Sequence, residues 1–153
     1  MMIEKIKIYL FSSLFMLFCL FNYSLALADE AVLEDSETLY LSGLANYEKK
    51  NYEEAIKLLQ LAVTQKPDVA KYHHILAVSY GREAENVNWF KAMDYAKRTL
   101  SHLERSNDLD PNNLEILDDL MDFYHEAPGF LGGDTEKGNE IKDLIEKLSL
   151  ESQ

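Results

Sequence analysis

The chain has 153 residues, of which 27 are Asp or Glu and 15 are Lys or Arg, so its formal net charge is −12. Because this charge repels phosphate groups, we expect neither nucleic-acid binding nor electrostatic attachment to anionic lipid. The single cysteine excludes an intramolecular disulfide.

The first part of the chain is predicted to be an export signal. Lys5 and Lys7 precede an apolar run over residues 8–21, and Ala-Leu-Ala follows at residues 26–28. This order is typical of a secretory signal peptide that is cleaved after Ala28. The run is shorter than the roughly 20 apolar residues of a membrane-spanning helix. An uncleaved N-terminal anchor stays open as the alternative.

The prediction therefore divides the chain into a signal peptide at residues 1–28 and a mature domain at residues 29–153. The mature domain would be periplasmic or secreted in a bacterium, with no contact to the membrane after cleavage. The only cysteine, Cys19, would leave with the signal, so the mature domain would have neither a thiol nucleophile nor a thiolate metal ligand.

The sequence after Ala28 has the apolar spacing of α-helices and no sustained strand alternation. The first predicted joint holds Asn51, which we expect to cap the following helix in a capping box with Glu54. Trp89 and Phe90 begin the fourth helix and are expected to cover the seam between neighbouring hairpins. The six predicted helices are residues 34–49, 52–65, 69–85, 89–107, 114–125 and a last one that Asp134 caps.

Residues 127–133, Ala-Pro-Gly-Phe-Leu-Gly-Gly, cannot be helical throughout because they contain one proline and three glycines. We interpret them as a structural turn that packs Phe130 and Leu131 against the helices. Glycines before a helix can bind phosphate. Here Asp134 would occupy the free N–H groups itself, and the lysine of a P-loop is missing.

Small residues and prolines recur in one order. Gly43, Ala55 and Pro67 are spaced by twelve and twelve residues, and Ala77, Ala92 and Pro111 by fifteen and nineteen. A small residue allows two helices to approach closely, and a proline ends each pair. The pattern predicts stacked helical hairpins. The second helix of the second unit is seven residues longer than that of the first unit. Seven residues are about two turns, so the apolar side chains of the extension fall on nearly the same helix face.

Residues 36–69 resemble a tetratricopeptide repeat (TPR), with Gly43, Tyr52, Ala55, Leu59, Ala62 and Pro67 at that family's signature positions. The resemblance implies an all-α, right-handed solenoid of about three hairpins, at residues 36–69, 70–113 and 114–150. The Ala-Pro-Gly-Phe-Leu-Gly-Gly segment is similar to a loop in the last repeat of exported bacterial TPR proteins. Gly138 departs from the pattern, which favours alanine there, and it predicts a weak last hairpin.

The resemblance also implies a binding surface, because the first helix of each TPR hairpin faces the ligand. The implied surface changes from aromatic through basic to acidic, so a protein or peptide partner would need an apolar portion and a basic end. We expect binding without catalysis and without a cofactor. The implied residues are Tyr40, Leu44, Tyr47, Lys71, His74, Val78, Arg82, Glu115, Asp118, Asp122 and His125.

Histidine ligation of a metal is not expected, because His73 and His74 are adjacent and point about 100° apart on a helix. His73 stands at a position where we expect the side chain to pack between helices. His74 and His125 could still approach one another together with Asp118 or Asp122, which keeps a metal-dependent enzyme as a remote alternative.

Two further alternatives stay open. One is a periplasmic ligand-binding subunit like the T component of TRAP solute transporters, with a small-molecule pocket walled by Tyr40, Tyr47, Tyr80 and His74. The other concerns assembly, because a stack of three hairpins has open ends and homo-oligomers could form there.

Overall fold

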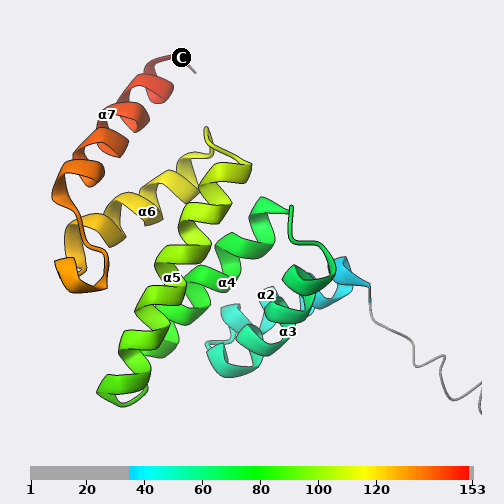
Figure 1. Ribbon diagram of the computed structural model, residues 1–153. Coiled ribbons are helices and arrows are strands. Elements are labelled where there is room, and N and C mark those ends of the chain that lie inside the picture. Colours follow the sequence, from blue (N-terminus) through cyan, green and yellow to red (C-terminus); the bar gives the residue numbers. More distant parts are fainter. Residues whose placement is uncertain (1–34, 152–153) are drawn as a thin grey trace, which may run out of the picture. The chain divides into compact units, whose positions relative to one another are not determined.

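Six α-helices and one short 3₁₀ helix follow one another in residues 35–151, the part of the chain that the computed structural model describes (Figure 1). No strand occurs within that range, and the prediction of an all-α fold is confirmed. The predicted signal peptide and its cleavage site lie outside the described residues. The elements are α2 (Ser36–Glu48), α3 (Tyr52–Gln65), α4 (Ala70–Ala84), α5 (Trp89–Leu109), α6 (Leu114–Glu126), η1 (Gly129–Leu131) and α7 (Thr135–Glu151).

The helices pack as consecutive hairpins. Within hairpins, α2 packs on α3, α4 on α5 and α6 on α7, while α3 contacts α4 and α5 contacts α6 between hairpins. The first five helices begin and end within two residues of their predicted bounds, and α7 begins directly after Asp134, as predicted. The result is a stack of three helical hairpins, as the repeated small residues and prolines predict.

Polar side chains begin most of these helices. Asp35, Asn88, Asn113 and Asp134 each accept hydrogen bonds from free N–H groups in the first turn of the helix that follows, which is the usual role of an N-cap. The capping box predicted at Asn51 is wrong. The Asn51 side chain instead donates to the Asn46 side chain, at 3.1 Å, across the joint.

The largest core cluster joins the first hairpin to α4, and its buried members include Leu39, Leu59 and Leu76. Gly43 allows this packing, because a Cβ atom there would stand 2.6 Å from Cγ of Leu59 and 3.4 Å from the carbonyl oxygen of Ala55. Ala55 is fully buried. The close approach predicted from Gly43 and Ala55 is confirmed.

In the second hairpin, the residue of α5 that contacts Ala77 differs from the predicted one. Ala77 is fully buried, but its carbonyl accepts a hydrogen bond from the Thr99 hydroxyl at 3.3 Å, whereas Ala92 is only half-buried. Thr99 follows Ala92 by seven residues, which is the predicted length of the helix extension. The start of α5 therefore lies well before its contact with Ala77. Trp89 and Phe90 lie there 62% and 79% exposed, so the prediction that they cover a seam is wrong.

The turn before α7 depends on two of its glycines. Gly132 has a φ of 103°, in the left-handed region, and a side chain at Gly133 would overlap the carbonyl of Ala127. The prediction of a structural turn is confirmed, with Asp134 capping α7 as expected. Phe130 is 66% exposed, however, so the predicted packing of its ring against the stack is wrong.

Gly138 is the buried residue of α7. A side chain there would overlap the imidazole of His125 in α6, so the glycine lets α6 and α7 pack at this point. The weak last hairpin stays a prediction. Further along α7, Ile141, Leu144, Ile145 and Leu148 are half-buried, whereas Leu150 is 74% exposed. Across residues 35–151, none of the helices combines the length and the hydropathy needed to cross a membrane.

Candidate functional site

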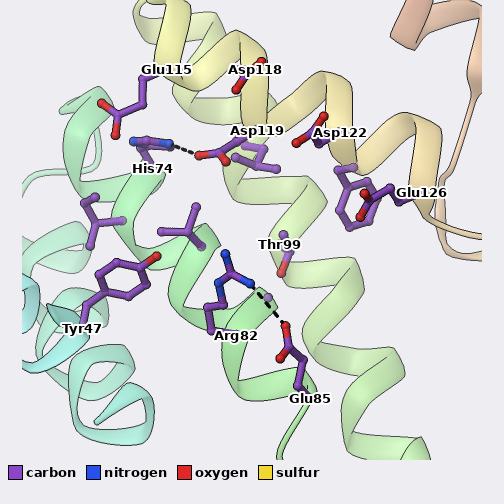
Figure 2. Close-up of a pocket in the computed structure, with 15 residues that line it drawn as sticks. Tyr47, His74, Arg82, Glu85, Thr99, Glu115, Asp118, Asp119, Asp122 and Glu126 are labelled. Carbon is purple, nitrogen blue, oxygen red and sulfur yellow. Dashed lines mark hydrogen bonds and ion pairs between the residues drawn. The ribbon is translucent and has the colours of Figure 1, made fainter. Parts of the chain in front are cut away.

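A groove with a volume of about 430 Å³ lies between the first helices of the three hairpins and α5 (Figure 2). Tyr47 from α2, a row of residues from α4, Thr99 and Leu103 from α5, and a second row from α6 line it. The short joints force α2, α4 and α6 onto the same side of the stack. Side chains that are far apart in the sequence therefore meet across one concave surface.

One wall of the groove is acidic. Five carboxylates of α6 line it, at Glu115, Asp118, Asp119, Asp122 and Glu126, and Figure 2 shows them along that helix. Their spacing of three or four residues places them on one helix face. We call these five residues the acidic row.

Most of the acidic row has no internal partner. Within residues 35–151, the side chains of Glu115, Asp118, Asp122 and Glu126 make no hydrogen bond or ion pair. Desolvation by burial, together with the negative charges of Asp118, Glu126 and Asp119, raises the pKa of Asp122 above its usual value. Like charges at this spacing are mutually destabilising. The charge of His125 acts in the opposite direction and lowers the pKa of Asp122. The row therefore remains a largely unpaired set of negative charges that faces the groove.

The wall of the groove opposite the acidic row carries a positively charged side chain, that of Arg82. Arg82 in α4 lies between Tyr47 and Glu85 (Figure 2), and its guanidinium reaches the Glu85 carboxylate at 3.5 Å, with both side chains largely exposed. Such an exposed pair contributes little stability, so Arg82 keeps donors for another acceptor. Apolar side chains from three helices line the groove as well, namely Ile75, Val78, Leu103 and Phe123.

His74 joins the two walls. Its side chain is buried, and its Nε2–H donates to a carboxylate oxygen of Asp119 at 2.6 Å. The bond connects α4 to the acidic row and uses the one member of the row that has an internal partner. We infer that this contact holds the two walls at a fixed separation.

The structure brings seven of the eleven predicted binding residues to the groove and places the other four elsewhere. Tyr40 is buried and stacks on Tyr72, with ring centroids 5.0 Å apart. Lys71 lies over the Tyr40 ring and pairs with Glu37 at 2.7 Å. Leu44 packs against the core cluster, and His125 lies against Gly138. Those that line the groove are Tyr47, His74, Val78, Arg82, Asp118 and Asp122, together with Glu115.

Sequence reasoning missed Asp119, Glu126, Thr99 and Phe123. The first two belong to the same three-to-four spacing as Glu115 and Asp122, so the period of the acids contained the signal. Thr99 carried no such signal, because its place in the lining depends on how α5 packs against α4. Phe123 follows Asp119 by four residues on the same face of α6, so its position also contained the signal.

The two alternative sites do not assemble from their expected residues. Tyr40 and Tyr80 belong to the core cluster, so they do not wall a small-molecule pocket with Tyr47 and His74. His74 bonds Asp119 rather than approaching His125. Among residues 35–151, the structure contains no group of three or more His, Cys, Asp or Glu side chains placed to hold a metal ion.

Comparison with known proteins gives a likeness to solved structures. No family model and no curated protein matches the sequence. Among solved structures, the chain is similar to MamA, a TPR-containing protein, with a TM-score of 0.61 and 16% sequence identity. The match covers 78% of this chain and 61% of MamA, so the chain spans about three fifths of that protein's length. The likeness concerns the fold alone, and the fold of this chain is a TPR-like helical stack.

Proposed function

We propose that this protein is a non-catalytic binding module that holds a segment of a protein partner in the groove between α4 and α6. The observation that carries the proposal is the acidic row, four members of which have no partner among residues 35–151 and face a concave surface. A protein retains uncompensated like charges on one helix face at a cost in stability. A bound cationic segment would remove that cost.

The groove also indicates the chemistry of the partner. Lysine or arginine side chains of the partner would meet the acidic row, and an apolar side chain would contact Val78 and Phe123. Arg82, opposite the row, would donate to a carbonyl or carboxylate of the same segment. Rigid aromatic side chains such as Tyr47 contribute large contact area at low entropic cost. Recognition would therefore require both signs of charge in a fixed order.

We further propose that the protein acts outside the cytoplasm, after a signal peptide at residues 1–28 has been removed. The charged start, the apolar run and the Ala-Leu-Ala end of that segment support this. The Ala-Pro-Gly-Phe-Leu-Gly-Gly turn supports kinship with exported bacterial TPR proteins, though its role in this chain is structural.

Site-specific photo-crosslinking in cells tests the proposal. A photoreactive amino acid at position 122 would be compared with one at Glu146, an exposed carboxylate of α7 outside the groove. We expect an adduct with a discrete protein from position 122 and none from position 146. Adding Arg82→Ala or Tyr47→Ala should abolish that adduct while circular dichroism stays unchanged.

Two results would reject the groove as the binding site. One is an equal set of adducts from positions 122 and 146. The other is an adduct from position 122 that persists in the double variant Tyr47→Ala and Arg82→Ala. Co-purification of a small organic molecule, with no protein adduct, would favour the ligand-binding subunit instead.

A further inference from the structure

Behind the groove, two histidines bond directly to one another. Nδ1 of His73 in α4 lies 2.9 Å from Nδ1 of His102 in α5, and Nε2 of His73 lies 3.1 Å from the carbonyl oxygen of Pro67. His73 is 5% exposed, and His102 is half-buried. Neither histidine belongs to the lining of the groove.

The contacts determine which nitrogens carry protons. A carbonyl oxygen only accepts, so Nε2 of His73 must donate to Pro67, which leaves Nδ1 of the neutral ring as an acceptor. Nδ1 of His102 must then carry the proton of the 2.9 Å bond. The chain of bonds runs from His102 through His73 to Pro67, and both rings are neutral in it.

This series of hydrogen bonds connects two helices and the turn before one of them. Pro67 stands in the turn between α3 and α4, His73 in the first turns of α4, and His102 in α5. One helical turn further along α5, the buried Ser106 hydroxyl donates to the carbonyl of Ala70 at 2.9 Å. The start of α4 is therefore attached to α5 at two neighbouring points, of which only the histidine bond can change with pH.

We propose that His73 and His102 form an acid-sensitive clasp that holds the start of α4 and the turn before it against α5, and that opens when the pair takes up protons. With two protons added, all four ring nitrogens are donors, and the Nδ1–Nδ1 contact becomes a contact between two donors of like charge. The bond must then break. The proposal concerns the fold and stands whether or not the groove binds a partner.

The surroundings oppose the uptake of protons. Burial and the His73 and Arg98 charges lower the pKa of His102 to about 4, and burial with the Arg105 charge lowers the pKa of His73. From α4, the Tyr80 ring stacks over His102 with centroids 6.0 Å apart. From α3, Gln60 donates to the Tyr80 hydroxyl, and the contact from the turn is the Pro67 carbonyl. The charges acting on the pair are therefore cationic.

The clasp also lies next to the groove. His74, the neighbour of His73, makes the bond to Asp119 that joins the two walls. Opening of the clasp would release the segment that positions this bond, so acid would loosen the groove from behind.

Nitrogen NMR of the histidine rings in the wild-type chain tests the geometry. At pH 7.5 we expect His73 to carry its proton on Nε2 and His102 on Nδ1, with a His102 pKa of about 4 and a His73 pKa below its ordinary value. A proton on Nδ1 of His73 at pH 7.5, or titration of both rings near pH 6.5, would overturn the proposal without any variant.

Amide hydrogen exchange tests the opening. Protection of residues 66–74 should fall between pH 6.5 and pH 4, by up to about tenfold per pH unit for each linked proton, while protection of α7 falls less. His102→Asn keeps a donor near Nδ1 but cannot titrate, so its protection should change less with pH. His125→Asn, which removes a histidine elsewhere, should behave as the wild type. Equal pH dependence in all three proteins would overturn the clasp.

Discussion

The two walls of the groove come from the same position in successive hairpins, yet they differ in what their polar side chains contact. In α4, the polar groups of His73, His74, Ser79 and Tyr80 are buried and hydrogen-bonded. In α6, the buried residues are Ile116, Leu117, Leu120 and Tyr124, and the acidic row has one internal partner. Both helices are first helices of a hairpin, so fold position alone does not explain the contrast.

This difference suggests that α4 contributes mainly to the stability of the fold, whereas the groove face of α6 contributes mainly to binding. The buried polar groups of α4, which packs against α3 of the first hairpin and α5 of its own, are hydrogen-bonded internally, so changes to these buried groups should destabilise the protein. The groove face of α6 satisfies few of its own charges, so changes there should leave the fold intact. The predictions below test this division, beginning with the largest expected effect.

The strongest effect is expected at Leu76, which is buried in the core cluster on α4. Leu76→Ala should lower the free energy of unfolding by about 2–5 kcal/mol, because it leaves a cavity. Leu144→Ala, at a half-buried position of α7, should cost clearly less. Urea denaturation of both variants measures the difference, and equal losses would contradict a core centred on α4.

Acid should destabilise the protein through the histidine pair. Because the pKa of folded His102 is about 4, against about 6.5 in the unfolded chain, the unfolded chain binds more protons. The stabilising contribution is complete above pH 6.5 and is lost as the pH falls toward 4. After allowance for solvent screening at a half-buried site, we expect a loss of about 1–2 kcal/mol. His102→Asn should flatten the curve obtained from urea denaturation at several pH values.

At Gly138 two effects oppose one another. Helix propensity alone predicts that Gly138→Ala stabilises α7 by about 1 kcal/mol. Overlap with the far end of the His125 ring opposes this gain. Because His125 is exposed, its ring can move aside, so we expect the single variant to be stabilised by less than the double variant with His125→Ala. Thermal denaturation of both variants measures the difference, and a destabilised single variant would show that the ring cannot move.

The smallest effect is expected in the acidic row. Asp122→Asn should raise the free energy of unfolding by about 0.2–0.5 kcal/mol for each like-charge pair that it removes. Because the pKa of Asp122 is raised, the repulsion is present above that pKa and is relieved as the pH falls through it. The gain should therefore shrink in acid. Loss of stability at pH 7.5 would mean that Asp122 has a structural role.

The sequence predicted the parts of the fold that depend on local pattern. Helix bounds followed from apolar spacing and from Asp134 and the prolines, and Gly43 with Ala55 marked a true close approach. The sequence could not show that Thr99, rather than Ala92, contacts Ala77 of α4, because Ala92 and Thr99 lie on nearly the same face of α5. The error at Trp89 and Phe90 has the same origin.

The sequence predicted the kinds of side chain that line the groove, but not which individual residues line it. Tyr40 and Lys71 have the right spacing for the groove, yet Tyr72 stacks on the first and Glu37 pairs with the second. Such contacts between hairpins are set by how the helices turn against one another. The same applies to Gly138, whose fit to His125 no local pattern contains.

Charge reversal tests the central claim most directly. Once photo-crosslinking at position 122 has identified a partner, calorimetry would measure its binding to a variant with Asp118→Lys and Asp122→Lys. The matched control is Asp143→Lys with Glu146→Lys, on exposed positions of α7. We predict at least a tenfold loss of affinity for the first variant, at unchanged helicity, and wild-type affinity for the second. Equal affinities in both variants would contradict the groove as the binding site.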